Sequence, residues 1–226
     1  MKVGAIIPAA GRGTRIGAAM PKQFLQLQGR PLIHHTLKIF ASCEAIDYVV
    51  LVMPQIDVDK SGDDWLNGYE VVRNVIVGGQ QRQDSVYNGF LALEASTKIV
   101  VVHDGVRPFT TPQMIADTVE AAEQHGAAIT AIPLSDTIKK VAGGFVERTV
   151  PREGLWRVQT PQAFQYGLLQ KAFKKATADS YYGTDEGALV EYLGGQVKIV
   201  SGSELNIKIT RKEDLILGES LLSAVK

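Results

Sequence analysis

The sequence Val3-Gly-Ala-Ile-Ile-Pro-Ala-Ala-Gly-Arg-Gly-Thr-Arg-Ile-Gly17 decides the fold, together with the Pro21-Lys22-Gln23 that follows it. Its apolar start, Val3–Ile7, is uninterrupted, which is typical of a parallel strand buried on both faces. After Pro8 the residues are small, and glycines allow backbone N–H groups to approach a ligand closely. Consecutive N–H groups in such a loop form an anion-binding concavity, to which this loop adds the cations Arg12, Arg15 and Lys22. The stretch therefore predicts a cradle for a triphosphate.

The rest of the chain alternates strand patterns with helix patterns. We expect strands over Val3–Ile7, Ile46–Met53, Val71–Val77, Ile99–Val102, Ala127–Ile132 and Val197–Val200. We expect helices from Pro31 to Phe40, from Asp84 or Ser85 to Leu93, from Thr111 to about Gln124, over Tyr166–Ala178, after Thr184-Asp185-Glu186, and after a Thr210–Glu213 capping box. This alternation indicates βαβ units and a mainly parallel sheet. Ligands bind such sheets beyond the carboxyl ends of the strands, where we expect the Gly11 loop, Gly78-Gly79, Asp104 and the Pro133 region.

A hairpin pattern interrupts this alternation. Thr137–Val141 and Phe145–Val150 flank the turn sequence Ala142-Gly143-Gly144. An isolated two-stranded hairpin is marginal in water, so it must pack either on a second subunit or back on its own sheet. Trp156 is a candidate anchor for a subunit contact. Because no repeat or linker appears, we expect a single domain over residues 1–226, with a hairpin arm at about 136–158 used for dimerisation.

Composition excludes several classes of protein. The net charge of zero argues against a nucleic-acid or membrane surface, and no apolar run is long enough for a bilayer. Met1-Lys2 leads directly into the first strand, so we expect no signal peptide. Cys43 is the only cysteine, which rules out an internal disulfide, suits the cytoplasm and favours a structural role. Six basic residues precede the first acidic residue, Glu44, which indicates either a segment that meets an anion or a solvated face.

The remaining motifs restrict the chemistry. Gly11, Gly13 and Gly17 are spaced one residue too widely for the dinucleotide fingerprint, and Ile16 stands where a Walker A loop needs glycine. Cations in the loop suit phosphoryl or nucleotidyl transfer, which depends mainly on positioning and charge neutralisation. A phosphate-monoester nucleophile, with a second pKa of about 6, needs no general base. Asp104 is the best-placed carboxylate for Mg²⁺, unless it only forms a turn before glycine.

Six motifs together resemble a known family. They are Pro8-Ala-Ala-Gly-x-Gly-x-Arg15, Pro21-Lys22-Gln23, Gly78-Gly79-x-x-Arg82-x-Asp84-Ser85, His103-Asp104-x-x-Arg107-Pro108, Thr160-Pro161-Gln162 and Asn206-Ile-Lys208. In this order they resemble the 2-C-methyl-D-erythritol 4-phosphate cytidylyltransferases of the non-mevalonate isoprenoid pathway. The resemblance covers the whole chain. It implies a doubly wound α/β fold, like that of nucleotide-diphospho-sugar transferases, with an arm that interlocks two subunits. It also implies CMP transfer from CTP to a sugar-alcohol phosphate.

The resemblance also implies roles for individual residues. The catalytic residues would be Arg15, Lys22, Arg152 and Lys208. CTP would be held by Ala9, Ala10, Gly11, Gly13, Gly79, Gln80, Ser85 and Gly105. Methylerythritol phosphate would be held by Arg107, Thr137, Arg152, Thr160 and Lys208. Asp104 would bind Mg²⁺ or another divalent metal, and Arg152 would act across a homodimer.

Other functions remain open from the sequence. Ribitol-5-phosphate cytidylyltransferases share most of these motifs but usually begin the loop with Ala-Gly-Gly, so Pro8–Gly11 favours methylerythritol phosphate. A nucleotide-binding regulatory module would bind without turnover, which the retained Arg15, Lys22 and Lys208 disfavour. A dinucleotide oxidoreductase fits least, because the fingerprint fails.

Overall fold

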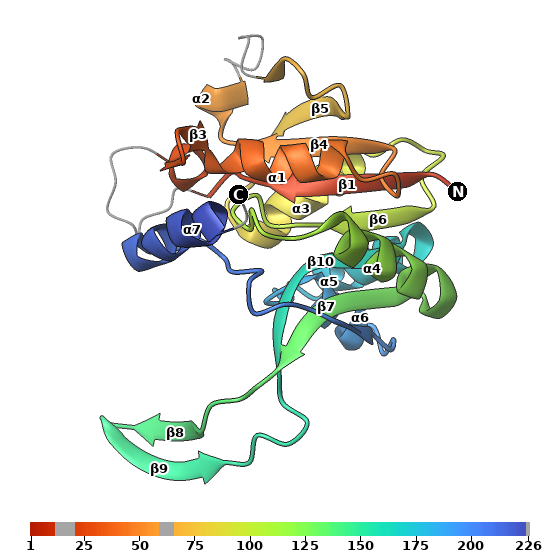
Figure 1. Ribbon diagram of the computed structural model, residues 1–226. Helices are drawn as coiled ribbons and strands as arrows, with labels where there is room; N and C mark the ends of the chain where they lie inside the picture. The colour runs from red at the N-terminus through yellow and green to blue at the C-terminus, as the bar shows by residue number, and fades with distance from the viewer. Residues whose placement is uncertain (12–20, 59–65, 225–226) are drawn as a thin grey trace.

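A computed structural model describes residues 1–11, 21–58 and 66–224 of the chain. Its described part forms a central seven-stranded sheet with the order β11-β7-β10-β6-β1-β4-β5 (Figure 1). The strands are β1 (Val3–Pro8), β4 (Tyr48–Met53), β5 (Val72–Val77), β6 (Ile99–Val102), β7 (Ala127–Pro133), β10 (Trp156–Gln165) and β11 (Lys198–Ser201). β1 runs parallel to β4 and β6, β4 to β5, and β7 to β11, while β10 is antiparallel to both of its neighbours. The expected mainly parallel sheet is confirmed.

Helices cover both faces of the sheet. α1 (Leu32–Ala41) and α4 (Pro112–His125) pack on one face, and α3 (Arg82–Leu91), α5 (Tyr166–Ala178) and α6 (Glu186–Tyr192) pack on the other. Ala5 and Ile7 of β1 point into the first layer, whereas Ile6 points into the second. Because alternate side chains are buried on opposite faces, both sets must be apolar. This arrangement explains the unbroken apolar sequence of β1.

Shorter elements complete the chain. The described part also contains η2 (Lys22–Phe24), α2 (Gln55–Val58), α7 (Lys212–Ala224), and the paired short strands β2 (Gln26–Leu27) and β3 (Arg30–Pro31). α7 closes a separate small cluster around Leu27, Leu32, Val106 and Ile209. Within the described ranges, no helix combines the length and the apolar character that a membrane span requires.

The sequence patterns did not predict β10, although it lies between β6 and β7 inside the sheet. Pro161, which follows a cis peptide bond, makes this stretch look unlike a central strand. The pairing of β10 with β7 shifts register between Val158 and Gln162. Pro161 falls inside that irregularity, where the ladder does not need its missing N–H. The bulge therefore reconciles the proline with a central strand.

Two helix starts also differ from the expectation. α3 begins at Arg82 after the N-cap Gln81, and the carboxylate of Asp84 accepts from the Gln81 N–H at 2.9 Å. Asp84 therefore lies in the first turn and is not the cap. At α7 the Thr210 N–H donates to Asp214 at 2.8 Å, so Asp214 takes the place expected for Glu213. The exact partner of a capping side chain depends on local backbone geometry that spacing alone does not reveal.

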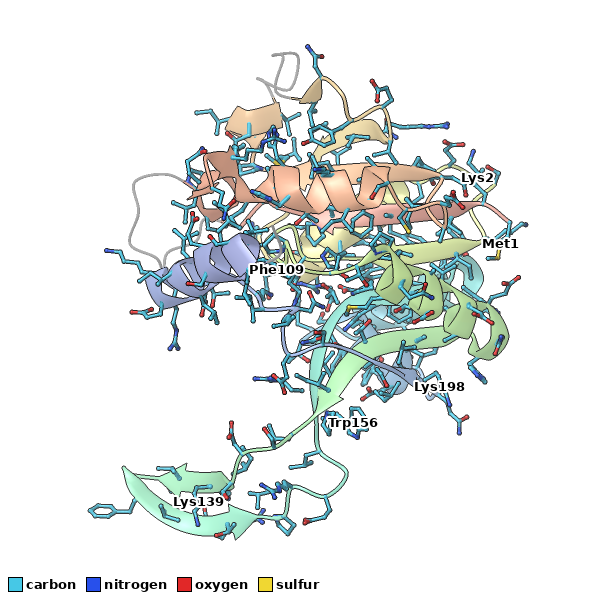
Figure 2. The ribbon with its side chains drawn as sticks, in the orientation of Figure 1. Met1, Lys2, Phe109, Lys139, Trp156 and Lys198 are labelled. Atoms are coloured by element: carbon cyan, nitrogen blue, oxygen red, sulfur yellow. The ribbon has the colours of Figure 1, made fainter. Side chains whose placement is uncertain are left out.

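The hairpin of β8 (Ile138–Ala142) and β9 (Phe145–Val150) projects away from the body of the protein (Figure 1). Nearly all of its residues are exposed, including Phe145 at 81%. Figure 2 shows Trp156 where β10 leaves the sheet toward the arm. A hairpin folded back on its own sheet is therefore excluded, and the projecting arm is confirmed.

We predict that Gly89→Ala destabilises the fold although alanine favours helices. A Cβ at Gly89 would lie 2.5 Å from Ile6 Cγ2 and 3.1 Å from Val52 Cγ2, between α3 and the sheet. Overpacking of this kind lowers the free energy of unfolding by about 1–3 kcal/mol. Guanidinium chloride unfolding measures the change, with Gly167→Ala in α5 as the control because nothing lies within 4 Å of that Cβ. A Gly89→Ala protein as stable as the unaltered chain would contradict the close packing of α3 on β1.

Candidate active site

Two cavities share a wall at the carboxyl ends of the parallel strands. The larger encloses about 720 Å³ and is lined by the loop after β1, by η2, by the loop after β5 and by the start of α3. The smaller, of about 220 Å³, lies against β10 and the segment before α6. Arg82, Asp104 and Lys208 line both cavities. The larger volume is in the range of small-molecule sites, so the edge expected from the sequence holds a compartment of suitable size.

Close backbone packing shapes the larger cavity. A Cβ at Gly78 would lie 2.3 Å from the Cβ of Ala10, so only glycine lets the loops after β5 and β1 come so close. The Gly79 N–H donates to Ser85 Oγ at 3.1 Å, and that hydroxyl donates to the Gln81 carbonyl at 3.1 Å. Ser85 therefore fixes the loop at the start of α3. Of the residues predicted to bind CTP, the larger cavity is lined by Ala9, Ala10, Gly11, Gly79, Gln80 and Ser85.

Asp104 lies at the centre of the shared wall, 7% exposed and facing three cations. Its carboxylate is 2.8 Å from Lys208 Nζ, 3.4 Å from Arg82 Nε and 3.5 Å from Arg107 Nε. Burial by itself would raise the pKa of Asp104, but the charges of Arg82, Lys208 and Arg107 hold it well below its usual range. Asp104 is therefore an ionised carboxylate inside the site.

Arg82 joins Asp104 to a second buried carboxylate. Its Nη1 lies 2.9 and 3.0 Å from the two carboxylate oxygens of Glu186. Burial opposes the charge of Arg82, yet Glu186 and Asp104 raise its pKa above the ordinary value. Burial also raises the pKa of Glu186, which Arg82 counteracts. The charge of Arg82 favours the ionised form of Glu186, and both carboxylate oxygens accept from Nη1.

The segment before α7 delivers Lys208 to the site. The Ile209 N–H donates to the Val106 carbonyl at 2.9 Å, and Arg107 Nη1 donates to the Asn206 carbonyl at 2.7 Å. The Asn206 amide donates in turn to the Thr160 carbonyl at 2.9 Å. These bonds attach residues 206–209 to the end of β6 and to β10. The predicted substrate residues Arg107, Thr160 and Lys208 therefore line one cavity.

A buried histidine orients the Thr160 hydroxyl. His103 Nε2 is 3.1 Å from the Arg107 carbonyl, which can only accept, so Nε2 carries the proton and Nδ1 is the acceptor. The Thr160 hydroxyl, 3.0 Å away, must donate to Nδ1, and its oxygen accepts from the Asp104 N–H at 3.1 Å. Burial lowers the pKa of His103 to about 4, which keeps the ring neutral near pH 7. Thr160 is thereby fixed beside Asp104.

The donor set fits a divalent cation that arrives with phosphates. No cluster of three or more His, Cys, Asp or Glu side chains that could hold a metal occurs within residues 1–11, 21–58 and 66–224. Asp104 offers one ionised carboxylate, and Mg²⁺ commonly takes one or two carboxylates together with substrate phosphates and water. A metal at Asp104 would therefore depend on the bound nucleotide for its other ligands.

Several predicted residues lie elsewhere. Gly13 and Arg15 fall outside the described residues. Gly105 is buried and does not line the larger cavity, although an added Cβ would lie 3.3 Å from the Cβ of Ala9, which does. Thr137 and Arg152 are exposed on the arm and at its foot, and neither lines the larger or the smaller cavity. One chain alone therefore does not assemble the complete predicted set.

The structure adds residues that the sequence motifs left without a role. Arg82 stood within the motif after the double glycine, but the motif did not reveal its partners. Glu186 lies in the first turn of α6, and its side chain is 1% exposed and contacts Arg82. Thr184 and Asp185 line the smaller cavity. These residues reach the site only because the fold brings the start of α6 to the start of α3, where Glu186 pairs with Arg82.

The doubly wound sheet and the cationic double cavity at its strand ends define the class of α/β nucleotidyltransferases. Comparison with known proteins gives the family. The chain belongs to the 2-C-methyl-D-erythritol 4-phosphate cytidylyltransferase family, whose pattern it matches over residues 3–224. It is 42% identical to the protein of that name from Geotalea uraniireducens (strain Rf4), over 100% of this chain and 98% of the relative.

Solved structures agree with this assignment. The crystal structure of 4-diphosphocytidyl-2C-methyl-D-erythritol synthase from Anaerococcus prevotii DSM 20548 matches with a TM-score of 0.86 and 33% identity, covering 98% of both chains. That of 2-C-methyl-D-erythritol 4-phosphate cytidylyltransferase from Thermus thermophilus matches with a TM-score of 0.82 and 36% identity, covering 99% of this chain and 100% of the other. The doubly wound fold inferred from the resemblance is confirmed.

We predict that Asp104→Asn destabilises the protein. The change leaves Arg82, Arg107 and Lys208 facing one another without the carboxylate, which should lower the free energy of unfolding by about 3 kcal/mol. Inorganic pyrophosphate, which supplies negative charge to the same cations, should raise the melting temperature of this variant more than that of the unaltered protein. Differential scanning fluorimetry measures both.

The control is Asp179→Asn, which breaks the exposed Lys175–Asp179 pair and should change little. An Asp104→Asn protein with the unaltered melting temperature, and no added response to pyrophosphate, would show that Asp104 does not hold the three cations together.

Proposed function

We propose that this protein transfers CMP from CTP to 2-C-methyl-D-erythritol 4-phosphate and releases pyrophosphate. The observation that supports this most is the shared wall of Arg82, Asp104 and Lys208 between a nucleotide-sized cavity and a smaller one. Two phosphate-bearing substrates could meet at this wall from opposite sides. Family membership supplies the identity of the nucleotide and of its acceptor.

CTP would occupy the larger cavity. Ala9, Ala10, Gly11, Gly79, Gln80 and Ser85 line it, and we assign Gly13 and Gly105 to the same nucleotide. Backbone groups of these small residues suit the recognition of a pyrimidine, because N–H and C=O groups can approach the ring edge closely. Asp104 would hold Mg²⁺, which supplies charge neutralisation to the triphosphate when bound.

The acceptor phosphate would lie in the smaller cavity near Arg107, Thr160 and Lys208. One of its oxygens attacks the α-phosphorus of CTP in line, forming the new O–P bond as the bond to pyrophosphate breaks. The acceptor phosphate is already anionic at neutral pH, so no protein group needs to remove a proton. We assign Lys22 and Arg15 to the charge that builds on the transferring phosphoryl group.

We further infer that the arm builds a homodimer and that Arg152 and Thr137 act on the site of the other subunit. Neither residue lines the cavities of its own chain. The arm exposes apolar side chains in water, at Val141, Phe145, Val146, Leu155 and Trp156. Exposed apolar surface of this kind marks an interaction site. Because the arm continues into β10, a subunit contact at the arm could influence the position of Thr160, which lies in that strand. Cytoplasmic location stays a prediction.

The activity is tested by a coupled pyrophosphate assay. With CTP, methylerythritol phosphate and Mg²⁺ we expect release of one pyrophosphate per acceptor consumed, and none when the acceptor is left out. Ribitol 5-phosphate in place of methylerythritol phosphate tests the sister activity, and we expect little release. Binding of CTP without any release, beside an active control enzyme, would favour a regulatory module and contradict the proposal.

Complementation between subunits tests Arg152. We expect Arg152→Ala and Lys22→Ala each to lower kcat by about 100-fold or more. Dimers that contain one variant chain of each kind should regain up to about half of the normal activity per dimer, since one of the two sites then has both residues. Activity of co-expressed, doubly tagged dimers measures this. Confirmed mixed dimers without any regained activity would show that Arg152 does not act in trans.

A further inference from the structure

Arg82 bridges two buried carboxylates on opposite sides of its guanidinium. Nη1 lies 2.9 and 3.0 Å from the oxygens of Glu186, whereas Nε lies at a longer 3.4 Å from Asp104. Nη2 makes no hydrogen bond to the described residues. Arg82 is partly exposed and lines both cavities. The guanidinium is therefore fixed at two nitrogens and has a third available to a ligand.

Glu186 has no other polar partner in the described part of the chain. Its side chain is 1% exposed, and within the described residues its only side-chain hydrogen bonds are those with Arg82. Burying a carboxylate is costly unless it is paired, and an apolar residue often serves a core better. The residue also lines neither cavity. Its effect on the site must therefore pass through Arg82.

The position of Glu186 decides which carboxylate holds Arg82 more closely. Without the Glu186 charge, the guanidinium would be drawn wholly to Asp104, the other anion within reach. The guanidinium would then pair with the Asp104 carboxylate, which also faces Lys208 and Arg107. Holding Nη1 at Glu186 keeps Arg82 at the junction of the cavities and away from full pairing with Asp104.

We propose that Glu186 is a positioning residue for the transfer reaction, which holds Arg82 so that Nη2 faces the phosphates that meet between the two cavities. The inference rests on the proposed function. An arginine fixed beforehand by its own partner costs no reorganisation when charge builds during reaction. Guanidinium N–H groups are also well suited to phosphate oxygens.

Gln83 provides a matched control because its side chain also joins the start of α3 to the segment before α6, without a hydrogen bond to the Arg82 side chain. Its amide donates to the Tyr181 carbonyl at 3.0 Å, and its oxygen accepts from the Gly183 N–H at 2.9 Å. Gln83→Ala therefore loosens the start of α3 from the segment before α6 while the Arg82–Glu186 pair stays. If an effect of Glu186→Gln reflects only a looser contact between these two segments, Gln83→Ala should show the same effect.

Steady-state kinetics of Glu186→Gln test the proposal. The glutamine keeps the size of the side chain and one acceptor but loses the charge that holds Nη1. We expect kcat to fall about tenfold while KM for CTP stays within about twofold, since the lost contact belongs to the transition state. Gln83→Ala should lower the melting temperature with kcat within about twofold of normal. Glu186→Gln with normal kcat would overturn the proposal.

A double variant tests whether Glu186 acts through Arg82. In Arg82→Gln/Glu186→Gln we expect kcat no lower than in Arg82→Gln alone. A further full tenfold fall would mean that Glu186 acts independently and would overturn the proposal. If Glu186→Gln does not fold, Arg82→Lys carries the test, because it keeps a charge beside Glu186 but cannot bridge both carboxylates. We expect the same tenfold fall, and normal kcat would again overturn the proposal.

The activity of the unaltered protein distinguishes a failure of this inference from a failure of the proposed function. If it releases no pyrophosphate from CTP and methylerythritol phosphate, the proposed function fails and the inference falls with it. If it turns over normally and Glu186→Gln does too, only the role of Glu186 fails.

Discussion

One carboxylate surrounded by three cations organises this protein. Asp104 is almost fully buried at the end of β6, and it stays ionised because Arg82, Arg107 and Lys208 reach it from three parts of the chain. With Glu186 included, three positive charges face two negative ones, which leaves one net positive charge. The site is therefore stable without a ligand and still favours an anion.

The antiparallel strand β10 connects this centre to the arm. It pairs with β6 and β7 inside the sheet and then continues outward to Trp156. Its bulge places Thr160 under Asp104, where His103 orients the hydroxyl. The same strand thus lines the smaller cavity with Val158, Gln159, Thr160 and Gln162 and meets the arm at its first residue, Trp156. A subunit contact made by the arm would therefore lie close to the smaller cavity.

Much of this fold could be predicted from sequence because the strands around β1 are buried on both faces and read as unbroken apolar runs. The strand-end positions of Gly79 and Asp104 followed from the same pattern. β10 could not be predicted, because Pro161 argues against a central strand unless a bulge is known. The Arg82–Glu186 pair could not be predicted either, since the two residues are about a hundred positions apart and meet only where the fold brings together the starts of α3 and α6. The motif after the double glycine includes Arg82, but it does not show that Asp104 and Glu186 pair with this arginine.

We propose that the protein positions the two phosphates and neutralises their charge without forming a covalent bond to either. A single in-line displacement at the α-phosphorus inverts its configuration, whereas two displacements through a protein nucleophile restore it. The most direct measurement is ³¹P NMR of the product formed from one diastereomer of CTP with sulfur on the α-phosphorus. Inversion is the predicted result. Retention would contradict the account, because it would require a nucleophilic side chain that accepts CMP before the acceptor does.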